Sequence, residues 1–150
     1  MHNRAAIGEL LERGGLSPRR DLGQNFVADA NTVRRIARLA EVGPGDHVVE
    51  IGAGLGSLTL ALAETGAQIL AVEVDRGVVP ILRELTADLP NVSVVEADAM
   101  KADWANLLAG HDRWVMVANL PYNVATPLVC DLLDDVPAID RMLVMVQREA

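Results

Sequence analysis

The sequence contains a single cysteine among its 150 residues. One cysteine cannot close an internal disulfide or build a cysteine-ligated zinc site, and we expect Cys130 to be a small buried side chain on a helix. Long apolar runs are also missing, because no segment approaches the roughly 20 residues that a membrane-spanning helix needs. The N-terminus, Met1 to Ala5, lacks the basic head and apolar stretch of a signal peptide. These absences predict a cytoplasmic protein with no membrane partner and no metal ion.

Positive charge is scarce and unevenly placed. The formal net charge is −8, yet residues 1–40 contain seven arginines and four acids, whereas residues 41–150 contain six basic and 17 acidic residues. An acidic body disfavours a nucleic-acid partner, because the phosphate backbone is bound mainly by Lys and Arg. The arginines near the front are either a solvated helix face or a phosphate-contacting edge. The candidates for RNA contact are Arg19, Arg20, Arg34 and Arg35.

Apolar and charged residues make up 51% and 23% of the chain, which is typical of a globular protein and excludes a disordered one. From residue 47 onward, short apolar segments alternate with helix-forming ones. This alternation predicts an α/β fold, in which helices cover both faces of a parallel sheet and ligands bind beyond the carboxyl ends of the strands. The predicted strands cover residues 47–51, 69–74, 92–95, 113–118 and 141–146, and the predicted helices cover residues 58–64, 76–88, 104–108 and 126–133.

The ends of the chain differ from this alternating region. Residues 1–28 are predicted to form an N-terminal helix and a polar loop, and residues 29–150 form the sheet domain, which opens with a helix capped by Asp29. Only four residues, Gln147 to Ala150, follow the last predicted strand. A five-stranded parallel sheet that stops there has an open edge, which is an aggregation hazard. We therefore expect the chain to be part of a longer protein.

A glycine-rich segment, Glu50 to Gly56, follows the first predicted strand. Glycine lets a backbone turn sharply and approach a ligand closely, although the segment is also compatible with a tight turn that binds nothing. Glu73 ends the second strand 21 residues after Gly52, where an acid would hold the hydroxyls of an adenosine ribose; the alternative is an exposed acid. Because Ser57 replaces the last glycine of a dinucleotide-binding motif, S-adenosylmethionine is favoured over NAD.

Two further strand ends carry polar residues. Asp98 follows the third strand, where a carboxylate would accept a hydrogen bond from the amine of a bound adenine or would instead cap the next helix. Asn119 and Pro121 follow the fourth strand and would present a side-chain and a main-chain carbonyl to the hydrogens of an aromatic amine. Tyr122 would offer a ring on which a flipped base stacks. An ordinary turn does not account for several ligand-like strand ends at once, so this motif favours chemistry on a base.

Together these motifs resemble the ribosomal RNA adenine dimethyltransferase family, and within it the bacterial small-subunit branch. The resemblance implies a Rossmann-like methyltransferase that uses S-adenosylmethionine and dimethylates N6 of two adjacent adenosines in small-subunit ribosomal RNA. It also implies a monomer at full length, with a helical C-terminal domain beyond residue 150. The resemblance extends from about Leu16 to the end of the chain and rests on Gly23 to Phe26, Glu50 to Gly56, Val72 to Asp75, Glu96 to Ala99 and Asn119 to Tyr122.

The resemblance further implies roles for individual residues. Asn119 would lie between the cofactor and the target base, and its acceptor groups would orient the amine without a general base. Family members usually have Leu where this chain has Val27, but the contact expected there is made by the backbone. The implied cofactor-binding residues are Asn25, Val27, Gly52, Gly54, Glu73, Asp98, Ala99 and Asn119, and the implied catalytic residues are Asn119, Pro121 and Tyr122.

Three competing functions stay open on the sequence alone. The first is a non-catalytic factor that binds ribosomal RNA during ribosome assembly, although such a factor need not keep the acceptors and ring of residues 119–122. The second is a large-subunit rRNA methyltransferase that confers macrolide resistance; those enzymes tend to carry Ile where this chain has Leu120. The third is an NAD-dependent oxidoreductase, which the glycine spacing disfavours. No histidine follows a strand end, so we assign no catalytic histidine.

Overall fold

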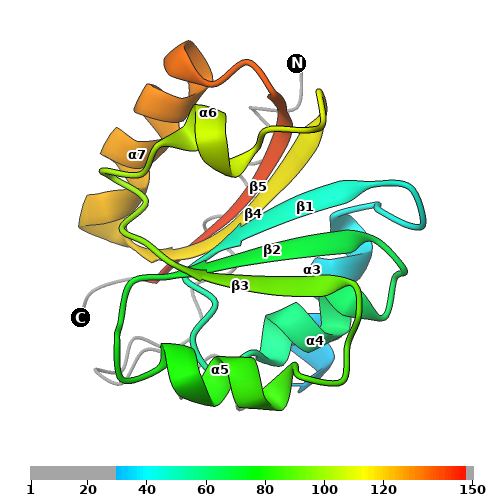
Figure 1. Cartoon of the computed structure of the whole chain (residues 1–150). Coiled ribbons are helices and arrows are strands. Elements are labelled where there is room, and N and C mark those ends of the chain that lie inside the picture. Colours follow the sequence, from blue (N-terminus) through cyan, green and yellow to red (C-terminus); the bar gives the residue numbers. More distant parts are fainter. Residues whose placement is uncertain (1–29, 148–150) are drawn as a thin grey trace.

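Five short segments rich in valine, isoleucine and leucine form a single parallel sheet (Figure 1). Branched side chains favour the extended backbone and pack well on a pleated surface. The computed structural model describes residues 30–147 of the chain. Within this range the strands are β1 (His47–Ile51), β2 (Gln68–Glu73), β3 (Val92–Glu96), β4 (Trp114–Pro121) and β5 (Ile139–Gln147).

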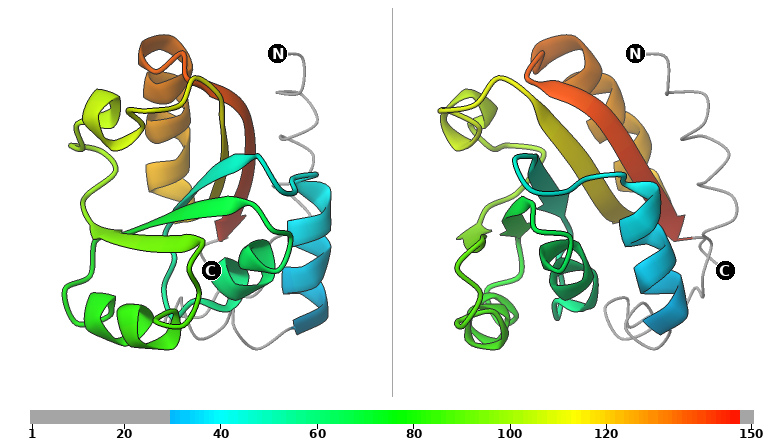
Figure 2. Two further views of the ribbon diagram at one scale, coloured as in Figure 1. Left: turned by 45° about the vertical axis from the view of Figure 1, so that its right-hand side comes forward. Right: turned by 90° about the vertical axis from the view of Figure 1, so that its right-hand side faces the viewer.

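Helices cover both faces of the sheet, as the two views in Figure 2 show. On one face lie α3 (Ala30–Leu39), α4 (Ser57–Ala63) and α5 (Val79–Leu85). On the other face lie α6 (Trp104–Leu107) and α7 (Tyr122–Asp135). Strands alternate with helices from β1 to β5, which confirms the predicted α/β class with a parallel sheet covered on both sides.

The order of the strands is β3-β2-β1-β4-β5, which places β1 at the centre of the sheet. Ile51 at the end of β1 pairs in register with Val72 of β2 on one side and with Ala118 of β4 on the other. After β3 the chain crosses to the far side of β1, so the direction of strand addition reverses between β1 and β4. In sheets of this kind, ligands bind outside the carboxyl ends of the strands at that reversal.

Three apolar clusters hold the helices to the sheet, and the smallest joins Leu82 of α5 to Ala71 of β2. One cluster packs α6 and α7 against one face and includes the fully buried Met116 and Leu128. Another packs α3 and α4 against the opposite face and includes Val48 and Leu62. Burial of one such leucine stabilises the fold by about 1.5–3 kcal/mol. The sheet is therefore a rigid platform for the loops at its edges.

The end of β4 differs from the prediction. The strand was expected to end at Ala118, but it continues to Pro121, which pairs in register with Gln147 of β5. α7 then begins at once, with Pro121 as its N-cap, whereas the helix was predicted to begin at Thr126. Pro127 lies inside the helix. Burial of Ala125 and Leu128 holds these turns against the sheet and offsets the hydrogen bond that the proline cannot donate.

Cys130 is exposed, so the prediction of a buried side chain was wrong. The buried face of α7 contains Ala125, Leu128 and Leu132, which follow helical spacing. Cys130 comes two residues after Leu128, about 200° further around the helix, and therefore faces away from the core.

Candidate functional site

The ends of β1 and β4 approach each other closely at the reversal of strand order. Gly52, directly after β1, has a φ of 81°, which favours glycine. A Cβ added to Gly52 would come within 2.5 Å of the main-chain oxygen of Asn119. The glycine motif and the Asn119 to Pro121 segment, which the sequence separates widely, are therefore adjacent at one edge of the sheet.

Glu73 at the end of β2 holds the glycine-rich loop against the sheet through hydrogen bonds. The main-chain N–H of Gly54 donates to Glu73 Oε1 at 2.7 Å, and the N–H of Asp75 donates to Oε2 at 3.0 Å. The N–H of Gly52 also donates to the carbonyl of Val72 at 3.0 Å. Glu73 is 8% exposed, so its carboxylate lies just beneath the surface of this edge. The loop that begins at Gly52 is thus held against the Glu73 carboxylate by main-chain N–H donors.

Asp98 lies beyond the end of β3 at the same edge. The N–H of Ala97 donates to the carbonyl of Glu73, which continues the pairing of β2 and β3 past their register partners Glu73 and Glu96. Asp98 Oδ1 accepts the N–H of Met100 at 2.9 Å, which forms a local turn. Ala99 is tied to the next helix, because its carbonyl accepts the indole N–H of Trp104 at 3.1 Å. This segment is fixed in place, and Asp98 and Ala99 stay half-buried beside it.

Glu50 is a buried acid that is absent from the predicted site residues. It is 1% exposed, and its Oε1 accepts a hydrogen bond from Thr59 Oγ1 of α4 at 2.5 Å. Burial raises the pKa of Glu50 to about 7; the Thr59 hydrogen bond lowers it, and the charge of Glu73 raises it. A charged residue between two buried apolar residues, Val49 and Ile51, was the signal that could have marked it.

The remaining predicted site residues lie on α3, at the start of α7 or outside the described part of the chain. Arg34 and Arg35 lie on α3 with their side chains exposed, so a partner could reach them. Tyr122 is the first residue of α7, directly after Pro121. The predicted residues Asn25, Val27, Arg19 and Arg20 lie outside the described residues, as does the side chain of Tyr122.

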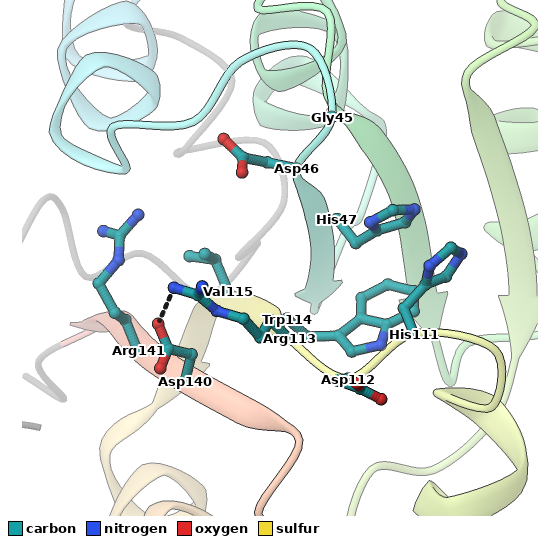
Figure 3. Close-up of a pocket in the computed structure, with 10 residues that line it drawn as sticks. All are labelled: Gly45, Asp46, His47, His111, Asp112, Arg113, Trp114, Val115, Asp140 and Arg141. Carbon is teal, nitrogen blue, oxygen red and sulfur yellow. Dashed lines mark hydrogen bonds and ion pairs between the residues drawn. The ribbon is translucent and has the colours of Figure 1, made fainter.

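A second group of polar residues lies at the opposite edge of the sheet (Figure 3). It lines an open pocket of about 360 Å³ at the start of β1 and β4. The ring of His47 stacks on that of His111 with centroids 3.5 Å apart, and Trp114 lies 5.4 Å from His47. Burial and the nearby His111 lower the pKa of His47, whereas Asp46 raises it. These histidines pack at the amino ends of the strands, away from Gly52 and Glu73.

Within residues 30–147, no three His, Cys, Asp or Glu side chains gather as a metal site would require. None of the helices in the same range is both long and apolar enough to cross a bilayer.

Sequence comparisons link the chain to proteins that act on ribosomal RNA. The family model described as "Ribosomal RNA adenine dimethylase" matches residues 15–150. "Ribosomal RNA small subunit methyltransferase A" of Streptomyces coelicolor is 48% identical over 150 residues, which cover 97% of this chain and 51% of that protein. The protein of the same name from Moorella thermoacetica is 46% identical over 148 residues, covering 93% and 51%. The chain spans about half the length of the curated relatives it matches.

Solved structures share the same fold. The 23S rRNA methyltransferase ErmE has a TM-score of 0.66 and 32% identity, covering 77% of this chain and 46% of that chain. A dimethyladenosine transferase from Plasmodium falciparum has a TM-score of 0.68 and 25% identity, covering 80% and 42%. An RNA methyltransferase from Salinibacter ruber, solved with S-adenosyl-L-homocysteine, resembles the fold with a TM-score of 0.62 and 21% identity, covering 75% and 71%.

Proposed function

Because the chain belongs to the ribosomal RNA adenine dimethylase family, we propose that it binds S-adenosylmethionine and transfers methyl groups to N6 of two adjacent adenosines in small-subunit ribosomal RNA. The relatives that support this substrate are named for the small ribosomal subunit and are 46–48% identical. ErmE, named for 23S rRNA, is 32% identical over a smaller part of the chain. Small-subunit RNA is therefore favoured over the large-subunit RNA of macrolide-resistance enzymes.

The observation that carries the proposal is the approach of Gly52 to Asn119 at the reversal of strand order. It puts the glycine loop, which would hold the methyl donor, beside the segment that would hold the acceptor. A direct transfer needs donor and acceptor in line and within contact distance, and fixed main-chain positions supply that order before either ligand arrives. In an NAD-dependent enzyme, an acceptor segment for an aromatic amine would have no use at this place.

The residues at this edge fit the adenosine part of S-adenosylmethionine. Each Glu73 oxygen accepts one main-chain N–H, and a carboxylate oxygen has room for a second donor. The ribose hydroxyls would supply those donors. Asp98, at the neighbouring strand end, has a second oxygen beyond the one that bonds Met100 and would accept the adenine amine. Gly52 and Gly54, both at positive φ, would let the loop backbone lie close to the amino-acid end.

The acceptor segment would orient the target amine. S-adenosylmethionine supplies an electrophilic methyl group on a positively charged sulfur. The lone pair of an aromatic amine is delocalised into the ring, so acceptance of its two hydrogens by the Asn119 side chain and the Pro121 carbonyl would favour a pyramidal nitrogen. Pro121 is the N-cap of α7, and its carbonyl keeps one lone pair beyond the first helical hydrogen bond. Tyr122 would stack on the base, and no general base is required.

The proposal also covers how the RNA is held. Arg34 and Arg35 on α3, with Arg19 and Arg20, would contact the phosphate backbone and offset the acidic body. Residues 1–28 would form a cofactor- and RNA-contacting arm, and residues 29–150 the cofactor-binding domain. We propose that the protein acts in the cytoplasm as a monomer. The relatives are about twice as long as this chain, and the family resemblance implies that a helical domain follows residue 150 in the full-length protein.

Methyl transfer to ribosomal subunits tests the proposal. Labelled S-adenosylmethionine is mixed with small or large subunits that lack adenine dimethylation, and with either this chain or a chimera that continues it with the second half of the Streptomyces coelicolor relative. We expect the chimera to label small-subunit RNA at N6 of adenosine, and the chain alone to bind the cofactor in titration calorimetry. NAD serves as the control ligand and should not bind.

Each alternative function has its own outcome. Label in large-subunit RNA alone would support the macrolide-resistance activity. Tight binding of small subunits without label, in a chimera whose cofactor site is filled, would support the non-catalytic assembly factor. Binding of NAD in place of S-adenosylmethionine would overturn the assignment of the cofactor.

A further inference from the structure

Glu50 is a buried carboxyl that the proposed transfer scheme does not use. It stands one residue before the end of β1, and Thr59 is the hydrogen-bond donor that the described residues offer it. Thr59 is itself fully buried and lies in the first turn of α4, the helix that follows the glycine loop. The bond between them therefore joins the central strand to the far end of the loop.

Glu50 and Glu73 lie on the same face of the sheet. Glu50 pairs in register with Ala71 of β2, and Glu73 follows two residues later, so the alternation of strand side chains puts both carboxyls on one side. Glu73 binds the loop through Gly54, and Glu50 binds the helix after the loop. Two carboxyl groups, 1% and 8% exposed, thus lie beneath one glycine loop.

Few ionisable side chains lie on the elements that pack against Glu50. β4 and α4, which pack against it, contain no titratable side chain, and β2 contributes Glu73. The arginines of α3 on the same face are exposed. Burial raises the pKa of Glu50 to about 7, with Thr59 opposing the rise and Glu73 adding to it. The carboxyl therefore changes charge near neutral pH.

We propose that Glu50 is a positioning residue of the cofactor site that acts without touching the ligand. Its carboxylate sets the negative charge beneath the glycine loop. That charge determines how strongly the site prefers the sulfonium of S-adenosylmethionine over the neutral thioether of S-adenosylhomocysteine. This inference rests on the proposed function. A negative charge in a poorly solvated floor attracts a cation more than an uncharged ligand of the same shape. Ionised Glu50 thus favours the methyl donor, and the product, which has lost the positive charge, is held less tightly.

The test compares the two ligands by titration calorimetry on the chain between pH 6 and pH 8. The Glu50→Gln side chain keeps an oxygen that accepts the Thr59 hydroxyl, but it cannot ionise. The matched control is Glu64→Gln, which removes an exposed acid at the end of α4, the helix that contains Thr59. The quantity compared is the ratio of the affinity for S-adenosylmethionine to the affinity for S-adenosylhomocysteine. Between pH 6 and pH 8, we expect this ratio to rise about fivefold more in the native chain and in Glu64→Gln than in Glu50→Gln. Titration of the ligand's own amino group is common to all variants and cancels in this difference.

Thr59→Val supplies a signature that a merely structural role would not produce. Loss of the hydroxyl donor raises the pKa of Glu50, so the change in ligand preference moves to higher pH than in the native chain. A change at unaltered pH in this variant contradicts the proposal.

Two results separate this inference from the proposed function. Binding of both ligands with the same pH dependence in native chain and Glu50→Gln overturns the inference alone, whereas binding of neither ligand overturns the proposed function as well. If Glu50→Gln does not fold, carbon-13 NMR titration of Glu50 in the native chain decides. Saturating S-adenosylmethionine must lower the pKa of Glu50 below its value with S-adenosylhomocysteine, because linkage is reciprocal. Equal values with the two ligands overturn the proposal.

Discussion

The Cα of Gly52 faces the main-chain carbonyl of Asn119 so closely that a Cβ on Gly52 would lie 2.5 Å from the Asn119 oxygen. Gly52 directly follows β1, and Asn119 lies two residues before the end of the neighbouring strand β4, at the reversal of strand order. No side chain fits between them. The absence of a side chain at Gly52 therefore sets how closely the donor loop and the acceptor segment approach each other.

Replacement of Gly52 should be more harmful than replacement of a glycine with the same backbone strain. Gly45 has a φ of 95° and nothing within 4 Å of an added Cβ, so Gly45→Ala should lose about 1–2 kcal/mol from strain alone. Gly52→Ala adds a contact with backbone that cannot give way, and we expect a loss of about 3 kcal/mol or more. Denaturant unfolding of both variants measures the difference. Equal losses would show that the close approach has no energetic weight.

Asn119→Ala separates catalysis from cofactor binding. In the chimera, we expect methyl transfer to small-subunit RNA to fall below detection, because one of the two acceptors for the target amine is gone. The affinity for S-adenosylmethionine should stay within a few-fold of the native value. Asn123→Ala, which changes an exposed residue in the first turn of α7, is the control and should keep both properties. Unchanged turnover in Asn119→Ala would refute the assigned role.

Glu73→Gln tests the support of the glycine loop. The amide keeps one acceptor oxygen, so either the Gly54 or the Asp75 N–H loses its partner, at a cost of about 1–3 kcal/mol. We expect affinity for S-adenosylmethionine to fall at least about tenfold. Glu96, the register partner of Glu73 on β3, is exposed. Glu96→Gln removes an equal charge and should change the affinity for S-adenosylmethionine little. Similar losses in both variants would point to net charge rather than loop support.

The burial of Glu50 predicts a pH-dependent stability. Its pKa is raised from 4.5 to about 7 on folding, so its contribution to stability is full below pH 4.5 and is lost as the pH rises through 7. Glu50→Gln carries no such charge. Relative to the native chain, the variant should gain about 2.5 kcal/mol in unfolding free energy between pH 5 and pH 8. Urea unfolding at the two pH values measures it, and an equal difference at both would contradict a buried titrating carboxyl.

His47 predicts the opposite pH response at the other edge of the sheet. Burial, and secondly His111, lower its pKa below 6.5, so the folded chain favours neutral His47. Its contribution to stability is full above pH 6.5 and is lost as the pH falls through the lowered value. We expect the thermal midpoint of the native chain to fall more between pH 7.5 and pH 5.5 than that of His47→Gln. Parallel falls in the two chains would exclude His47 as the cause.

Much of the fold was predictable because its strands and helices follow from local patterns of apolar and turn-forming residues. The strand His47–Ile51 has the predicted bounds, since an apolar run between a turn and a glycine segment leaves little choice. The end of β4 was not predictable in this way. Pro121 ordinarily stops a strand, and pairing with Gln147 of β5 overrides that tendency. Cys130 was misplaced because its burial was inferred from the residue type alone, whereas the packing of α7 on the sheet decides which side of the helix is buried.

The sequence by itself determined that polar residues follow several parallel strands, and parallel strands end at one edge, so Gly52, Glu73, Asp98 and Asn119 had to share that edge. Only the tertiary structure decided that β4 lies beside β1, which brings Asn119 against Gly52, and that Glu50 is buried under Thr59. The physical reason is the range of the interactions. Side-chain patterns act over a few residues, whereas strand order and burial come from hydrogen bonds and packing between segments far apart in the chain.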